Sequence, residues 1–170
     1  MITKTDIEKY FLAEKQAGLL LLIIALAAIL VALAGIFLFK TTFWKGIALS
    51  FILIAILEAF IGFTTYKAAD DLRKDNVYAL DMNPDNIIGK EIPRAAKVEQ
   101  NLTIIMWAVD SLLIAGIVFI AIFRNSPARQ LIYGIGIGIA IQSFILLGMT
   151  LISKKRTVTY NKQLQTIIKH

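Results

Sequence analysis

The chain has 170 residues, a formal net charge of +6 and no cysteine, and 58% of its residues are hydrophobic. Its mean hydropathy is +0.72, whereas soluble domains are only about 45–50% apolar. This composition excludes an ordinary soluble domain, and the absence of cysteine excludes disulfides, thiol nucleophiles and thiolate metal sites.

Four apolar runs dominate the chain, and each is about as long as a membrane span. At 1.5 Å rise per residue, roughly 20 residues cross the 30 Å hydrocarbon core. The runs cover residues 18–39, 46–66, 103–123 and 131–152. We therefore predict an all-α, polytopic membrane protein with four transmembrane helices. The first run contains a small-residue motif typical of signal cleavage, Ala32-Leu33-Ala34, but it continues to Phe39, so we expect a retained span.

The segment before the first span, residues 1–17, is predicted to be a cytoplasmic segment that can form an interfacial helix. Thr5 and Glu8 have the spacing of a capping box. Three apolar side chains fall on one helical face: Ile7, Tyr10 and Phe11.

Small residues recur within the first and the last span. Span one carries Ala25, Ala28, Ala32 and Gly35, and span four carries Gly134, Gly136 and Gly138. Small side chains let helix backbones approach closely in lipid. We predict that both sets pack helices together, and the same pattern would also suit an interface between subunits.

The distribution of basic residues predicts the topology. The connections at 40–45 and 124–130 are short, which favours two antiparallel hairpins. Fourteen of the 18 Lys and Arg residues fall in the other three hydrophilic segments. Because positive residues stay cytoplasmic, we expect both termini inside and a location in a bacterial inner membrane. The cytoplasmic parts would then also include a connecting segment at 67–102, with helical extensions, and a basic tail at 153–170.

The tail cluster Lys154-Lys155-Arg156 is interpreted as a topology anchor rather than as a nucleic-acid or specific lipid site. The net positive charge therefore does not predict binding to nucleic acid. The partner that composition does predict is the lipid bilayer. No pattern of residues indicates a cofactor or a metal, and the only histidine is His170 at the end of the chain.

Three polar residues fall at one depth in three different spans. From the rise per residue, Glu58, Asp110 and Gln142 lie roughly 10–16 Å from the cytoplasmic ends of their spans. A central carboxylate costs roughly 2.5–3.5 kcal/mol to insert, and no basic residue lies within a span to compensate it. We expect the two carboxyl groups to share a proton in a buried polar layer.

Three interpretations of this layer remain open. It is a proton or cation site, a structural hydrogen bond that fixes helix register, or a contact with a basic residue of another membrane subunit. We predict a non-enzymatic integral membrane protein that acts as a homo-oligomer or as an accessory or regulatory subunit of a membrane complex, immunity-type roles included. The alternative is a small proton- or cation-coupled transporter or channel that uses Glu58 and Asp110.

Overall fold

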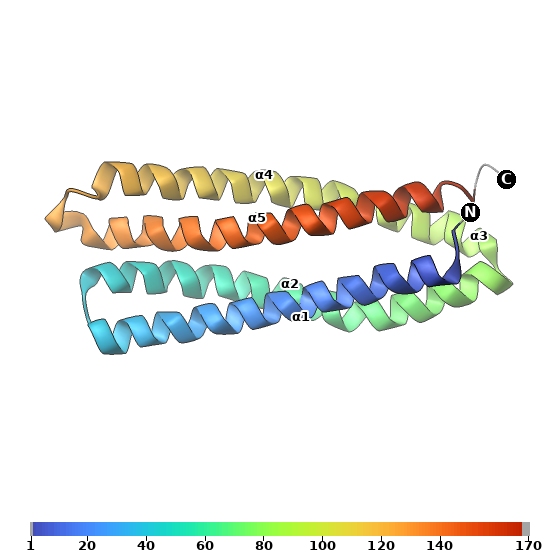
Figure 1. Ribbon diagram of the computed structural model, residues 1–170, viewed down its shortest axis with the longest axis horizontal. Coiled ribbons are helices and arrows are strands. Elements are labelled where there is room, and N and C mark those ends of the chain that lie inside the picture. The colour runs from blue at the N-terminus through green and yellow to red at the C-terminus, as the bar shows by residue number, and fades with distance from the viewer. Residues whose placement is uncertain (1, 168–170) are drawn as a thin grey trace.

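The computed structural model describes residues 2–167, and every regular element among them is helical (Figure 1). Met1 and residues 168–170, which belong to the predicted N-terminal segment and basic tail, lie outside this description. In chain order the elements are α1 (Lys4–Ala34), the π-helical turn η1 (Gly35–Phe39), α2 (Thr42–Met82), the short α3 (Pro84–Asn86), the π-helical turn η2 (Ile87–Glu91), α4 (Ile92–Phe123), the 3-10 turn η3 (Pro127–Arg129) and α5 (Gln130–Leu164).

Four helical stretches are long and apolar enough to cross a membrane, as the composition predicted. They are Lys4–Phe39, Thr42–Met82, Ile87–Phe123 and Pro127–Leu164. Each is longer than a span needs: α2 has 41 residues, or roughly 60 Å at 1.5 Å per residue. The four helices therefore continue well beyond a hydrocarbon core of about 30 Å.

The first helix begins earlier than the sequence predicted. Thr3 is the N-cap, its hydroxyl accepts from the Asp6 backbone, and the Asp6 carboxylate accepts from the Thr3 backbone N–H at 3.0 Å. The expected capping box of Thr5 and Glu8 is thus wrong, because the buried side chain of Ile2 sets the chain entry two residues earlier.

The long helices make their extensive contacts in the order α1, α2, α5, α4 (Figure 1). Helices α2 and α5 are the central pair and run in the same direction, since Gly46 lies on Gly134 and, further along both helices, Glu58 lies on Gln142. We call the end with residues 40–41 and 124–129 the loop end, and the end with residues 2–17, 67–102 and 153–167 the termini end.

We call the contact between two neighbouring long helices a seam. Each of the three seams (α1–α2, α2–α5 and α4–α5) contains a pair of glycines in backbone contact. A Cβ on either glycine of a pair would fall within about 3.0 Å of the partner helix backbone. The pairs are Gly18 with Gly62 (α1 and α2), Gly46 with Gly134 (α2 and α5), and Gly116 with Gly136 (α4 and α5). The pattern of small residues predicted Gly134 and Gly136 as packing residues, but it did not predict Gly18, Gly46, Gly62 or Gly116.

The small residues of the first span face α2. Ala25, Ala28 and Ala32 are buried in one cluster with side chains of α2, and a Cβ on Gly35 would meet the Trp44 ring at 2.7 Å. On α5, Gly138 lies against Ser50 of α2. These small side chains therefore set the close approach of α1 and α5 to the helix between them.

The termini end is a packed four-helix unit with its own apolar core. Residues 4–17 form the first part of α1 and continue into the first span without a break. Ile7 and Phe11 are fully buried in this part rather than exposed on a free apolar face. The turn η2 contributes the buried Ile87, α4 contributes Ala95, and α5 contributes Leu164. The apolar positions of 67–102, sparse in sequence, are thus sufficient to close this core.

Candidate functional site

Two of the three predicted polar residues meet at the seam between α2 and α5. Glu58 and Gln142 are each only 2% exposed, and the Gln142 Nε2 donates to the Glu58 Oε2 at 3.1 Å. Nearer the loop end, the Ser50 hydroxyl lies 3.1 Å from the Ile135 carbonyl and 3.2 Å from the Gly46 carbonyl, to which it donates. The central seam is therefore held by polar contacts as well as by glycines.

The second carboxyl oxygen of Glu58 is buried and has no hydrogen-bond partner among the described residues. Glu58 also lines a cavity of about 80 Å3, to which all four long helices contribute side chains. The lining is mostly apolar, with Thr150 and Ser153 of α5 as additional polar residues. A space of this volume has room for roughly two water molecules, and Glu58 is the ionisable residue among the described residues that line it.

Asp110 lies apart from this pair. Its neighbour Val109 is buried. Gly116, seven residues after Val109 and on the same face of α4, is also buried and contacts α5, so these two residues mark the contact stripe. Asp110 is turned about 100° round α4 from that contact stripe and is half-buried. Within residues 2–167 no hydrogen bond or ion pair involves its carboxylate, and it does not line the cavity beside Glu58. The described contacts thus join Glu58 to Gln142 and give no link through which Glu58 and Asp110 would share a proton.

A second polar cluster, which was not predicted from the sequence, lies at the termini end. The Glu91 carboxylate accepts two hydrogen bonds from Arg94, both 2.7 Å, and one from Asn76 at 3.2 Å. The Tyr10 hydroxyl donates to Glu14 at 2.8 Å and lies 3.4 Å from the Thr157 hydroxyl. These residues come from α1, α2, η2, α4 and α5. Tyr10 with Glu14 and Glu91 with Arg94 have helical spacing in the sequence, but no local spacing joins these pairs to Asn76 or Thr157.

The pKa of Glu14 is raised by burial, an effect that the hydrogen bond from Tyr10 only partly offsets. As pH rises past the ordinary Glu pKa of about 4.3, the unfolded chain loses this proton while the folded protein retains it. Stability is therefore lost as pH rises from that value towards the folded pKa. We predict that Glu14→Gln raises Tm at pH 7 relative to wild type, and that the gain shrinks towards pH 4.

Thermal unfolding in detergent at several pH values measures this effect. Glu8→Gln is the matched control, because Glu8 lies on the same helix and has no recorded hydrogen bond or ion pair among the described residues. A gain for Glu14→Gln that does not change between pH 4 and pH 7 would contradict the assigned cause.

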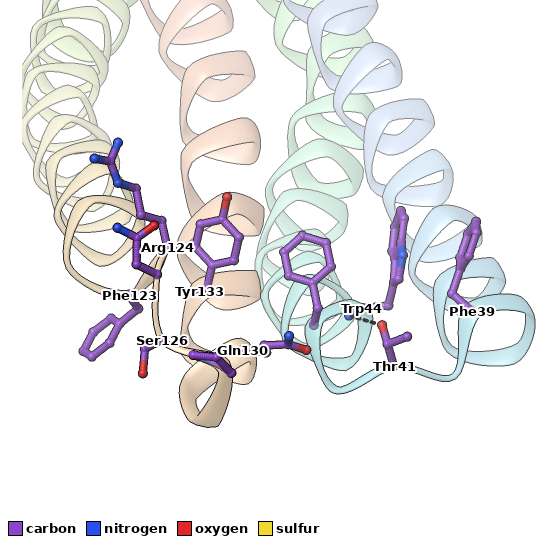
Figure 2. A pocket seen from close by; sticks show the side chains of 11 residues that line it. Phe39, Thr41, Trp44, Phe123, Arg124, Ser126, Gln130 and Tyr133 are labelled. Carbon is purple, nitrogen blue, oxygen red and sulfur yellow. Dashed lines mark hydrogen bonds between the residues drawn. The ribbon is translucent and has the colours of Figure 1, made fainter.

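The loop end holds an open hollow of about 610 Å3 between the two short connections (Figure 2). Arg124 and Tyr133 point back along the helices, while Thr41, Ser126 and Gln130 lie near the rim. The Trp44 backbone N–H donates to the Thr41 hydroxyl at 3.3 Å. Aromatic side chains gather here as they do where spans enter the headgroup region. This arrangement is typical of a membrane boundary, and none of the described residues that line the hollow is acidic.

The two polar sites do not form a metal centre. Among residues 2–167, no three His, Cys, Asp or Glu side chains are grouped so that they could hold a metal ion.

Compared with family models, with curated proteins and with solved structures, the chain shows no significant match.

Proposed function

We propose that this chain is a non-enzymatic accessory subunit of a membrane complex, built from two antiparallel hairpins in a bacterial inner membrane with both termini cytoplasmic. The observation that carries the proposal is Asp110. It is a half-exposed carboxylate within a span, and no described residue bonds to it. A carboxylate at that depth is costly unless a partner group or water compensates it.

The burial of the helices points to where such a partner would pack. The most apolar stretch of the α4 span is only 11% buried, against 44% for that of α2. One helical turn from Asp110, the Ile114 side chain is 62% exposed. The α4 span is thus the least covered of the four, and we assign its face with Asp110 to the interface with the partner.

The partner that fits this face is a transmembrane helix of a different protein that carries a basic side chain. None of the four spans contains Lys or Arg, so a second copy of this chain cannot supply a cation at the depth of Asp110. A basic side chain on a partner helix would compensate the Asp110 carboxylate within the membrane.

The absence of cysteine makes site-specific crosslinking the direct test. A single cysteine at Ile114 should crosslink to one membrane protein in cells, whereas a cysteine at the equally exposed Leu26 of α1 should not. Adding Asp110→Asn should abolish that crosslink. Ser111→Ala is the matched control, since the Ser111 hydroxyl donates to the Trp107 carbonyl of its own helix.

Three results would contradict the proposal. A crosslink that survives Asp110→Asn would show that the carboxylate does not hold the partner. A crosslinked product of exactly twice the mass of the chain would establish a homo-oligomer instead. No product at all from cysteines along this face of α4 would remove the interface.

A proton-coupled transporter is the second candidate, and the observation that favours it is the free oxygen of Glu58, a residue that lines the 80 Å3 cavity. In proteoliposomes, pH-dependent cation flux would then disappear in Glu58→Gln while the protein remains folded. Absence of such flux in the wild type would rule this candidate out.

A further inference from the structure

A groove of about 560 Å3 runs between the start of α1 and the end of α5. Three cations line it: Lys9 from α1, and Lys155 and Arg156 from α5. The stacked rings of Tyr10 and Tyr160, 3.8 Å apart, are both buried and also line it. We call this feature the basic groove.

The cations of the basic groove are not neutralised by the protein. Within residues 2–167 none of the three takes part in an ion pair, whereas their neighbours on α1 do: Lys4 pairs with Asp81, and Lys15 with Asp70. The only acidic residue in the lining is Asp6, and its carboxylate accepts from the backbone and the hydroxyl of Thr3.

The Glu14 carboxyl group interacts electrostatically with Arg156, but it already has a hydrogen-bond partner. It accepts from the Tyr10 hydroxyl at 2.8 Å, and burial raises its pKa, which favours the neutral acid. The basic groove therefore presents an excess of positive charge together with the side-chain amide of Gln163, whereas the Thr159 hydroxyl donates to the Lys155 carbonyl of its own helix.

The position of the basic groove along α5 identifies the source of the anion. Ile152, 65% exposed, lines its membrane side and is the last residue of the predicted span. Ile145 and Gly148 continue the same exposed face into the apolar region, and nothing lies within 4 Å of a Cβ built on Gly148. A phosphate among these cations would have acyl chains alongside this face.

We propose that the basic groove binds the phosphate of an anionic phospholipid in the leaflet at the termini end. Lys155 and Arg156 are about one turn beyond the end of the predicted span, at the level of lipid phosphates, and Lys9 lines the same groove. The exposed apolar face below them favours a lipid over a soluble phosphate, since it offers contact area that only acyl chains would use.

Native mass spectrometry of the full-length protein in mixed micelles tests this proposal, and the result does not depend on the orientation in a membrane. Wild type should retain phosphatidylglycerol in preference to phosphatidylcholine. The triple variant Lys9→Gln, Lys155→Gln, Arg156→Gln should bind it roughly tenfold or more weakly, given the attraction of each basic residue to anionic lipid. The matched control is Lys97→Gln, Lys154→Gln, Lys162→Gln, which removes the same charge outside the basic groove and should retain the lipid.

Equal losses in the two triple variants would overturn the proposal, because they would show attraction by net charge alone. Equal retention of phosphatidylcholine would overturn it too. Displacement by glycerol 3-phosphate at concentrations matching those of the lipid would identify a soluble ligand instead. If the triple variant does not fold, the exposed single change Lys155→Gln must still lower retention while Lys154→Gln does not.

Discussion

Gly134→Ala should destabilise the protein by about 3 kcal/mol or more, a large share of the roughly 5–15 kcal/mol that holds a domain folded. A Cβ at this position would lie 2.1 Å from the Phe43 carbonyl oxygen, which is backbone and cannot rotate away. Relief requires that α2 and α5 move apart, and overpacking of this kind costs typically 1–3 kcal/mol even where side chains can adjust. Opening this seam also breaks the contact between Gln142 and Glu58 further along it.

The measurement is unfolding in a titration of denaturing detergent, followed by far-UV circular dichroism. Gly148→Ala is the control on the same helix, because a Cβ there meets nothing within 4 Å. Alanine is the better helix former by about 1 kcal/mol, so this control should be neutral or slightly stabilising. If Gly134→Ala were as stable as Gly148→Ala, the central seam would not depend on backbone contact.

The helices were predictable from the sequence, but the faces that they turn to one another were not. About 20 consecutive apolar residues define a span whatever its neighbours are. The run from Gly134 to Gly138 is an example of packing directions that the sequence does not indicate. Gly134 and Gly138 face α2, while Gly136, about 200° round the helix, faces α4. The sequence shows three small residues but not that they divide between two partners.

For the polar layer, too, the sequence predicted the depth of each residue in its span but not the direction in which its side chain points. Rise per residue placed Glu58, Asp110 and Gln142 at one level, but it says nothing about rotation around each helix. Glu58 and Gln142 happen to turn towards each other, while Asp110 lies beside the α4–α5 contact rather than in it. The cluster around Glu91 was only partly predictable, because Glu91 and Arg94 are three residues apart in the sequence whereas Asn76 reaches Glu91 only after the helices have packed.

Gln142→Leu should cost about 2 kcal/mol, because it leaves the Glu58 carboxyl group buried with no hydrogen-bond partner at either oxygen. Unsatisfied buried polar groups cost about 1–3 kcal/mol. Glu58→Leu should cost a similar amount through the orphaned amide of Gln142. The double variant should cost clearly less than the two single changes together, since it removes both polar groups and fills the seam with apolar side chains.

A double-mutant cycle in the same detergent titration measures this coupling, which we expect to be about 1 kcal/mol or more. Glu58→Gln is the conservative control: it retains an acceptor for Gln142 and removes the acid, so it should preserve stability. Additive single changes would show that the hydrogen bond does not fix the register of α2 on α5. In that case the cost of burying Glu58 would need another explanation, and the free oxygen of this residue, which lines the cavity, would make a proton site the better interpretation of this pair.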